Sequence, residues 1–480
     1  MKKYLLLSAL VLLLGSCQNW LDIKPKTSIN EEDLFSSESG FKDALTGFYI
    51  KMGKTSLYGK NLTFRFMDIL AQRYDIDQIS TNGDKMYNFK SSYRGETDAI
   101  YSDMYNLIAN INNFLYQLEK RKDVVITKNY YDLMRGEALG LRAFLHFDLL
   151  RMFGPVYGIE PAKKSISYRV TFDKHATPLL AASAVVDLVV KDLLEAQELL
   201  AKVDSKIFSA DEGNNERNPF LILRQLRMNV YAVKATLARV YLYKGDVSSK
   251  QEAFKYASEV VECGHFKFQS SIENNLILFN EHIFSLNVYE LNKIIDPIFN
   301  NENVSSILYV KTRSLDEIYE TSGVGGGDTR LGLFREIDPD KSVTKKYNQT
   351  NYVSEYDGKD LIPLIRLPEM YYILSECDPD PVSSAEWLNI VRNQRAIPDN
   401  IPVDNGYDKP FAAGIDKTQT FRVNELMKEY MKEFYGEGQL FYFYKRHCYK
   451  YFRHCGMELG MEKENYMFQI PDNEIIFGKN

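Results

Sequence analysis

Tryptophan and cysteine are scarce in this chain. Its 480 residues include 2 Trp and 5 Cys, against 33 Tyr and 28 Phe. A ligand platform built on ring stacking must therefore use Tyr or Phe, because Trp20 lies near the N-terminus and Trp387 falls in a helical segment where core packing explains it. The four cysteines beyond residue 17 are scattered, which excludes the dense disulfide framework of small secreted domains. We expect buried free thiols, and one disulfide stays open as an alternative.

An excess of basic residues is also absent. The chain has 59 Lys and Arg against 65 Asp and Glu, a formal net charge of −6. A protein that binds nucleic acid neutralises phosphates with a basic face, so this balance argues against nucleic acid as a partner. After the first twenty residues, no apolar run is long enough to cross a bilayer.

The sequence signatures of several enzyme classes are missing. The chain contains no His-Glu-x-x-His and no Gly-x-Ser-x-Gly, and the glycine-rich segment 323–328 lacks the Gly-Lys-Ser/Thr that cradles phosphate. Glu433 and Glu437 are four residues apart and could suggest the acid/base pair of a glycosidase. We place both on one helix, where two carboxylates at this spacing seldom straddle a bond. The sequence therefore predicts a protein that is not an enzyme and needs no cofactor.

Metal-binding signatures are weak as well. Asp75 and Asp77 offer hard oxygen ligands for Ca²⁺, but an EF-hand needs a longer loop and a terminal Glu. Two His-Cys pairs begin at residues 447 and 454, whereas zinc sites usually show tighter pairs. The aromatic residues around these pairs are typical of core packing. We predict no metal site.

The N-terminus carries the most specific local signal. Lys2 and Lys3 form a basic region, and an apolar stretch from Tyr4 to Leu14 follows that is too short for an ordinary transmembrane helix. The next residues, Leu14-Gly15-Ser16-Cys17, resemble the bacterial lipobox. This predicts a lipoprotein signal peptide over residues 1–16, acylation at Cys17 and a lipidated tether over residues 17–30. The alternative is an ordinary secretory signal with a chance cysteine.

The stretch from Arg135 to Pro155 predicts a helix buried on two sides. At 3.6 residues per turn its polar residues fall into two narrow seams, and two separate apolar faces lie between them. One face carries Leu139, Ala143, Phe147 and Leu150, and the other carries Leu141, Leu145, Leu149 and Met152. A surface helix has a single apolar stripe, so this helix is expected to lie between other helices and to end at Gly154-Pro155.

Helical spacing recurs along much of the chain. The expected helices span residues 40–52, 98–121, 182–202, 229–244, 252–263, 363–377 and 385–395. The pair 229–244 and 252–263 resembles the tetratricopeptide pattern of small residues where paired helices cross, and the pair 363–377 and 385–395 repeats it. Because the spacing is irregular, we predict a mostly α fold: an irregular bundle of tetratricopeptide-like helix pairs in a single domain over residues 31–480.

Two long regions interrupt the helical pattern, at about residues 53–95 and 266–360. The second contains strand-like apolar runs at residues 283–289 and 307–310, separated by Asn-rich turns. Long loops on a helical scaffold tend to carry function. We expect the two regions to meet on one face and to form a loop-rich, partly β-containing ligand-binding region.

The first of these regions combines aromatic and polar residues. Sugar rings stack on aromatic side chains, and their hydroxyls bind planar amide, carboxylate or guanidinium groups. The candidate ligand-binding residues are Arg73, Tyr74, Asp75, Asp77, Tyr87 and Tyr93. Each of them taken alone is explained as well by packing or by an exposed surface position, so the prediction rests on the region as a set.

The order of several motifs resembles the SusD/RagB family of Bacteroidetes. The resemblance follows nearly the whole chain, and its most recognisable segment is the helix Gly-Glu-Ala-Leu-Gly-Leu-Arg-Ala-Phe-Leu-His-Phe-Asp-Leu-Leu-Arg-Met-Phe-Gly at residues 136–154. The other matching segments are residues 17–25, 235–246, 363–376, 388–396, 432–446 and 470–475. Each motif alone is modest, but their order along one chain is specific.

This resemblance implies a function and a location. Members of the family are outer-membrane lipoproteins that bind glycans, or peptides in some relatives, and form a lid on a SusC-like TonB-dependent transporter. We therefore expect a surface glycan-binding protein for nutrient uptake, held at the outer membrane by a lipid. Residues 18–22 lack the paired acids often associated with surface export, so surface exposure rests on the family alone. The alternatives are a lid or adaptor without a sugar site, a peptide-binding relative and, less favoured, a lipoprotein glycosidase.

Overall fold

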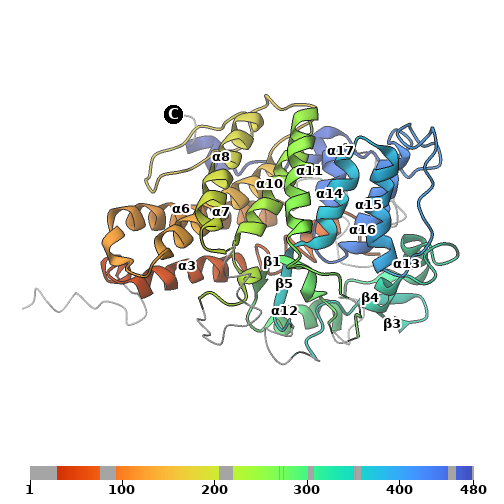
Figure 1. Ribbon diagram of the computed structural model, residues 1–480, viewed down its shortest axis with the longest axis horizontal. Coiled ribbons are helices and arrows are strands. Elements are labelled where there is room, and N and C mark those ends of the chain that lie inside the picture. The colour runs from red at the N-terminus through yellow and green to blue at the C-terminus, as the bar shows by residue number, and fades with distance from the viewer. Residues whose placement is uncertain are drawn as a thin grey trace, which may run out of the picture.

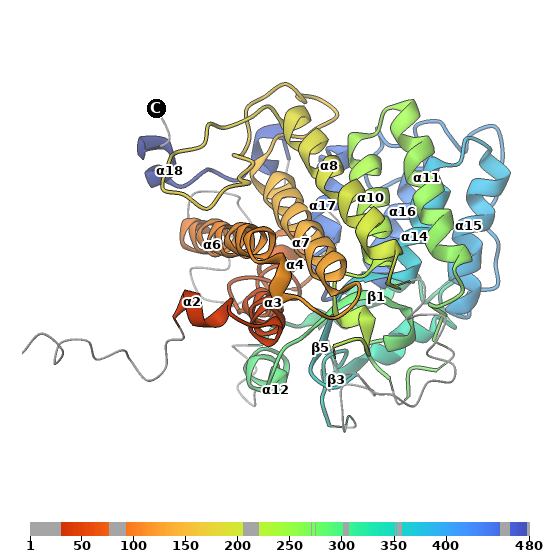
Figure 2. The same cartoon turned by 60° about the vertical axis from the view of Figure 1, so that its left-hand side comes forward.

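The long helices form one part of the molecule, and short strands with a few short helices form the other. The computed structural model describes residues 30–75, 93–204, 220–269, 271–273, 275–300, 307–350, 352, 358–451 and 461–477. In Figure 1 most of the long helices stand side by side across the upper part, and the strands gather below them with shorter helices. The view in Figure 2, turned about the vertical axis, shows the same arrangement.

The long helices contact one another in chain order. They are α3 (Glu38–Met52), α6 (Arg94–Lys120), α7 (Tyr130–Phe153), α8 (Ala182–Ala201), α10 (Val230–Lys244), α11 (Val247–Glu262), α14 (Leu367–Cys377), α15 (Pro381–Gln394) and α16 (Phe421–Glu433). Contacts run from α6 to α7, then to α8, α10, α11, α14 and α15. The shorter helices are α2 (Glu31–Leu34), α4 (Phe66–Leu70), α12 (Leu291–Ile295), α13 (Thr312–Tyr319), α17 (Leu440–His447) and α18 (Asp472–Phe477). The predicted mostly α bundle of successive helix pairs is confirmed.

Helix α7 has the inner position that its two apolar faces predict. Every residue from Gly136 to Phe153 is buried, and α6, α8 and α10 all contact the helix. Two glycines permit the closest approaches. A Cβ atom at Gly136 would lie 2.7 Å from Leu200 of α8, and one at Gly140 would lie 2.6 Å from Met228, just before α10. These positions need glycine because neighbouring side chains fill the space.

Buried ion pairs satisfy the polar seams of α7. Arg142 donates from Nε and Nη2 to the two carboxylate oxygens of Asp192 in α8, at 2.7 and 2.8 Å. Glu137 accepts hydrogen bonds from Arg224 at 2.5 Å and from the Tyr49 hydroxyl at 2.6 Å. A buried charge is costly unless it is paired, so these partners explain how a helix with charged residues can be enclosed.

The turn between α10 and α11 has the caps of a tight helix pair. The Asn229 side chain accepts from the backbone N–H groups of Tyr231 and Ala232, both at 2.9 Å, at the start of α10. Gly245 ends the helix with a φ of 75°, which glycine adopts without strain. The Asp246 carboxylate then accepts from Ser249 N–H at 3.0 Å and begins α11. Capping residues next to the helix ends therefore define this helix pair, and a longer loop is not needed.

Two small antiparallel sheets lie beneath the helices. β1 (His282–Asn287) pairs with β5 (Leu361–Arg366), and β4 (Lys341–Thr344) lies between β2 (Val310–Lys311) and β3 (Phe334–Asp338). The prediction of a helix that begins at residue 363 was wrong, because the chain first forms β5. Pro363 lies opposite Ser285 in a two-stranded sheet, where the missing N–H group is tolerated at an edge. Helix α14 begins at Leu367, with Pro368 in its first turn.

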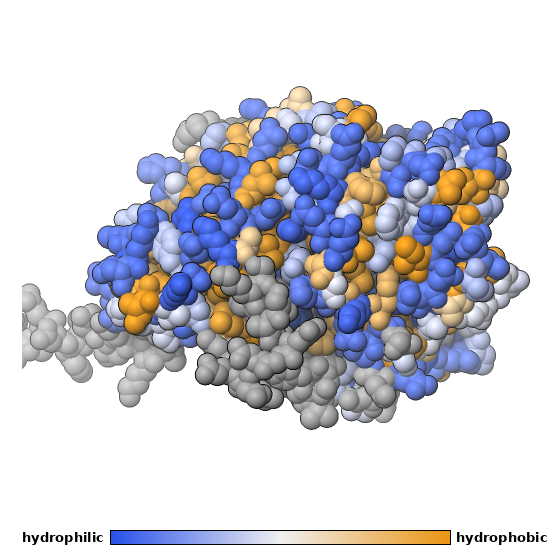
Figure 3. Space-filling view, viewed as in Figure 1, coloured by the Kyte–Doolittle hydropathy of each residue, from blue (hydrophilic) through white to orange (hydrophobic). Residues whose placement is uncertain are grey.

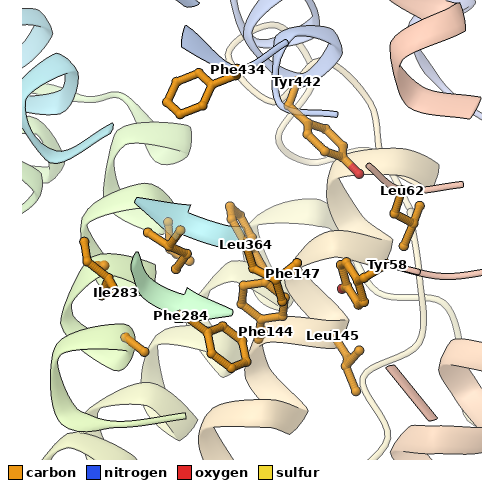
Figure 4. Close-up of a cluster of buried hydrophobic side chains, with 14 of the residues drawn as sticks. Tyr58, Leu62, Phe144, Leu145, Phe147, Ile283, Phe284, Leu364, Phe434 and Tyr442 are labelled. Atoms are coloured by element: carbon orange, nitrogen blue, oxygen red, sulfur yellow. The ribbon is translucent and has the colours of Figure 1, made fainter. Parts of the chain in front are cut away.

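A continuous hydrophobic core joins the helices to the sheets. Figure 4 shows side chains from the first loop region, from α7 and from both strands of the β1–β5 pair gathered in one cluster. Phe144 of α7 stands edge-on to Phe284 of β1, with ring centroids 5.6 Å apart, and lies 5.9 Å from the ring of Tyr58. The sheets are therefore attached to the helix array by packing as well as by chain connections.

A buried charge cluster lies where α15, α16 and β5 meet. The Glu433 carboxylate accepts from Arg366 at 2.7 Å, from Arg395 at 2.8 and 3.0 Å and from Arg330 at 3.0 Å. Glu437 accepts from Arg366 at 2.7 Å. The placement of Glu433 and Glu437 on one helix was wrong, because α16 ends at Glu433 and Glu437 lies in the turn before α17. Arginines hold both carboxylates inside the fold.

The two interrupting regions meet, as the sequence analysis expected. Asp75 N–H donates to the carbonyl of Tyr309 at 2.9 Å, and Lys311 N–H donates to the Asp75 carboxylate at 2.6 Å. A Cβ atom at Gly53 would lie 3.4 Å from Val288. Contacts at both ends of the first region therefore join it to the second region.

Three negative findings concern the described residues. Among them, no helix is both long and apolar enough to cross a membrane. No three His, Cys, Asp or Glu side chains of the described ranges lie together as a metal site would need. Cys263, Cys377 and Cys448 are free thiols, and Cys455 lies outside the described residues.

Two buried histidines make stability depend on pH. Burial lowers the pKa of His146 to about 3 and that of His282 to about 3. The His146 ring accepts from Arg169 N–H at Nε2, 3.0 Å away, and Nδ1 lies 2.9 Å from the Arg142 carbonyl. Nε2 is therefore the acceptor and Nδ1 carries the proton. A second proton, on Nε2, would place an N–H donor opposite the Arg169 N–H donor.

We expect the free energy of unfolding to fall as pH drops below about 6.5, where the unfolded histidines gain protons that the folded ones reject. Above about pH 6.5 the free energy of unfolding has its full value. By pH 5, protonation of each histidine in the unfolded chain lowers it by about 2 kcal/mol. Urea unfolding at several pH values should show a smaller pH dependence for His146→Gln than for the wild type. His175→Gln is the control, because His175 leaves 93% of its side chain exposed. Equal pH dependence in His146→Gln and the wild type would contradict the assignment.

Candidate functional site

Three of the predicted ligand-binding residues are enclosed by the fold. Tyr74 is completely buried and donates from its hydroxyl to the Phe64 carbonyl at 2.6 Å. Arg73 donates to the Met431 carbonyl and lies over the ring of Tyr435. Asp75 holds the contacts to the second loop region described above. The structure therefore corrects the interpretation of Arg73, Tyr74 and Asp75: they join the first loop region to the core, and their side chains offer no open surface for a sugar.

The other predicted residues are placed differently. Tyr93 is half-buried, and its ring lies 5.9 Å from Phe66 and 5.8 Å from Phe468. Asp77 and Tyr87 lie outside the described residues, as does the predicted lipidation site Cys17. For these three positions the sequence-based predictions stand as they were made.

A polar groove of about 680 Å³ opens in the second loop region, between α12 with the following turn and the chain around β3 and β5. Its lining is rich in amide, carboxylate and guanidinium side chains. The residues are Tyr289, Glu290, Asn292, Asp296, Asn300, Arg335, Asn348, Gln349, Thr350, Tyr352, Lys359 and Asp360. Among the described lining residues three acids face two bases, so their charges almost balance, and this lining suits a polar ligand with little net charge.

Of the described rings at this groove, Tyr289 is the most exposed. It leaves 81% of its surface exposed, whereas Tyr352 on the same groove is buried. Burial raises the pKa of Tyr352 to about 12, and its hydroxyl accepts from Ile277 N–H at 3.3 Å. Tyr352 is therefore part of the wall, and Tyr289 offers the free aromatic face on which a sugar ring could stack.

The backbone around Tyr289 is held in place. Glu290 has a φ of 56°, a left-handed conformation that turns the chain from β1 into α12. The Asp360 carboxylate accepts from Leu291 N–H at 3.0 Å, and the Asp360 carbonyl accepts from Val288 N–H at 2.7 Å. Gln349 in turn accepts from Asp360 N–H at 2.7 Å. These bonds fix both walls of the groove relative to each other before any ligand binds.

An apolar cleft of about 950 Å³ lies on the other side of Tyr289. It runs between the end of α3, the segment before α10 and the end of β1, and α12 lies just below α3 in Figure 2. Its lining residues are Thr46, Tyr49, Ile50, Gly53, Lys54, Thr55, Ile222, Leu223, Leu226, Arg227, Asn287, Val288, Tyr289 and Ile294. Both hollows have the size of small-molecule sites, and they share Tyr289.

The polar groove lies in the second of the two regions that were expected to form a ligand-binding region, whereas the candidate residues were chosen from the first. The signal for the groove was present in the Asn-rich turns of the second region and in Tyr289 at the end of a strand-like run. No periodicity marks Tyr289 as exposed, because burial along β1 does not alternate and the strand ends at Asn287.

Comparison with known proteins places the chain in a family. A family model described as "Starch-binding associating with outer membrane" matches residues 19–212, and the model of the SusD family matches residues 333–476. SusD-like protein P38 of Formosa agariphila is 27% identical over 40% of this chain and 36% of its own length. SusD-like protein P2 of the same organism is 26% identical over 53% of this chain and 46% of its own length. The match thus spans less than half of either relative.

Solved structures share the fold along almost the whole chain. A SusD superfamily protein from Bacteroides thetaiotaomicron superposes with a TM-score of 0.68 at 19% identity, covering 92% of this chain and 98% of the other. A SusD-like carbohydrate-binding protein from Bacteroides vulgatus gives a TM-score of 0.70 at 16% identity, covering 93% and 97%. At such identities the likeness shows the fold, and the two family models show the kinship. The chain belongs to the SusD/RagB family.

Proposed function

We propose that the protein captures a glycan at the cell surface and delivers it to a SusC-like TonB-dependent transporter of the outer membrane. The observation that carries this proposal is the exposed ring of Tyr289 at the edge of a polar groove lined by amide, carboxylate and guanidinium groups. This is the combination that sugar rings and their hydroxyls require. The family match supports the same ligand class.

Binding would use the groove as it stands. One sugar ring stacks on Tyr289, and the hydroxyls of that ring and its neighbours meet Asn292, Asn348 and Arg335 along the groove. A few hydrogen bonds and one stacked ring give weak to moderate affinity, which a delivery protein needs because the glycan must leave again. Because Asp360 is hydrogen-bonded to both walls, the site is already ordered, and binding does not have to supply the free energy of ordering it.

The proposed location follows from the N-terminus. Acylation at Cys17 would anchor the protein in the outer membrane, and residues 17–30 would form the tether between the lipid and the folded chain. The family model describes association with the outer membrane, which supports the anchor. Exposure at the cell surface would put the groove where extracellular glycan arrives and where a transporter can receive it.

The function is tested by a binding screen. Protein from Gln18 onward is run by native affinity electrophoresis through gels that contain one polysaccharide each, over a broad panel of plant, microbial and host polymers. We expect clear retardation by one polymer or a small related set. Retardation by none of them would contradict glycan capture and would favour a lid or adaptor of the transporter, or a peptide-binding role.

The anchor is tested by a single substitution. We expect Cys17→Ser to abolish incorporation of radiolabelled palmitate, because the thiol that receives the diacylglyceryl group is gone. The protein should move from the detergent phase to the aqueous phase in a Triton X-114 partition. Ser16→Ala is the control, since small residues are accepted before the lipidated cysteine. Labelling of the Cys17→Ser protein equal to that of the wild type would contradict lipidation at this position.

A further inference from the structure

Apart from Tyr289, the residues that line the apolar cleft have no part in the glycan contacts described above. Ile50 on its wall leaves 68% of its surface exposed, and Tyr289 leaves 81% exposed. Over the helices seen in Figure 3 hydrophobic and hydrophilic residues are interspersed, whereas here two of the most exposed apolar side chains line one hollow. Exposed apolar surface gathered in a concave site marks a place where an apolar group binds.

The charges in the cleft are already matched. Lys54 lies 2.9 Å from Asp103, and Arg227 lies 3.0 Å from the Glu137 carboxylate. No acid is found among the described residues that line the cleft, and the other polar residues of this lining are neutral. Both cationic side chains of the cleft already have an acidic partner, so the chemistry favours an uncharged apolar group.

The cleft also keeps its shape without a ligand. The Tyr49 hydroxyl donates to Glu137 at 2.6 Å and accepts from Met228 N–H at 3.0 Å, which fixes α3 against the segment before α10. On the opposite wall, the backbone bond from Val288 to Asp360 fixes the end of β1. An apolar group that enters therefore gains burial without having to order the walls first.

Tyr289 joins the two hollows, because it lines both of them. We propose that the glycan carries an acyl or aryl substituent: the sugar lies in the polar groove, and its substituent lies in the apolar cleft on the other side of Tyr289. A polar hollow and an apolar hollow that meet at one ring match a ligand with one polar and one apolar part. This inference rests on the proposed function, since it names the class of glycan that the same site takes.

The test compares two forms of one polymer. The polysaccharide that retards the protein is treated with mild alkali to remove all esters, and part of it is then lightly benzoylated. We expect the benzoylated form to bind the wild type roughly tenfold more tightly, because the cleft buries the aromatic ring. In Ile50→Asn the ratio of the two affinities should fall to about one. Ile126→Asn is the matched control, an isoleucine that is 85% exposed elsewhere on the molecule, and it should keep the wild-type ratio.

The outcomes separate the inference from the proposed function. Binding of the alkali-treated polymer with no gain on benzoylation overturns the inference and leaves glycan capture standing. A gain that Ile50→Asn retains in full also overturns it, because the aromatic group must then bind outside the cleft. Failure of every untreated polymer of the panel to retard the protein overturns the inference together with the proposed function.

Discussion

Replacing Glu433 by glutamine should destabilise the protein by about 3–5 kcal/mol, the usual effect of removing one partner from a buried ion pair. Glu433 is buried at the end of α16 and accepts hydrogen bonds from Arg366, Arg395 and Arg330. Glutamine keeps the shape of the side chain but removes the charge, and its NH₂ group faces arginine donors. Three guanidinium groups then share fewer acceptors in a place that water does not reach.

The measurement is the free energy of unfolding from urea denaturation at neutral pH. Burial by itself would raise the pKa of Glu433, but Arg395, Arg366 and Arg330 outweigh it and hold the pKa well below its usual range. The carboxylate is therefore charged at neutral pH, and its contribution is lost only in strong acid. Glu198→Gln on the exposed side of α8 is the control and should change stability by no more than about 0.5 kcal/mol. A similarly small change in Glu433→Gln would contradict a structural role for the cluster.

Replacing Tyr289 by alanine should weaken glycan binding at least roughly tenfold. The substitution removes the aromatic face at the polar groove, and with it the stacking contact and the apolar area that a bound sugar covers. Because 81% of Tyr289 is exposed, its removal costs the fold little, and the unfolding transition should stay near that of the wild type. The measurement is the apparent dissociation constant from the retardation of each variant at several polymer concentrations.

Tyr116→Ala is the matched control for this experiment. Tyr116 leaves 58% of its surface exposed on α6, and it lines neither the groove nor the cleft. Its removal should leave retardation unchanged. Retardation of Tyr289→Ala equal to that of Tyr116→Ala would show that the sugar does not stack on Tyr289.

The helix array could be predicted from sequence because its signals are local. The two apolar faces of residues 135–155 indicate a helix enclosed by others, and Gly154 ends α7 as expected. Asn229, Gly245 and Asp246 supply the caps of the α10–α11 pair within a few residues of each helix end. Helical periodicity and capping need no knowledge of distant residues, so they are read correctly from one sequence.

The strand β5 and the buried arginines could not be predicted in the same way. An apolar run before Leu367 fits a helix as well as a strand, and only its distant partner β1 decides for the strand. Likewise, the sequence does not reveal that Arg366, Arg395 and Arg330 converge on Glu433, because 38 to 103 residues separate them from it along the chain. Both features depend on pairing between residues that are far apart in the sequence, and local sequence patterns do not reveal such pairing.

The candidate site shows the same limit. The first loop region has a suitable mixture of aromatic and polar residues, but Tyr74 and Arg73 are buried in the core. Tyr289 has an ordinary sequence context, and its exposure follows from a left-handed residue at Glu290 and from the Asp360 contacts that turn the chain there. Composition therefore predicts a binding region, whereas the exposure of Tyr289, which carries the proposal, depends on tertiary contacts.

The most direct test of this account is a crystal structure of the protein with an oligosaccharide prepared from the polymer that retards it. We predict electron density for sugar rings in the polar groove, with one ring parallel to Tyr289 and hydroxyls within hydrogen-bond distance of Asn292, Asn348 or Arg335. Density for the oligosaccharide at another surface, with the groove empty, would contradict the central claim that this groove is the glycan site.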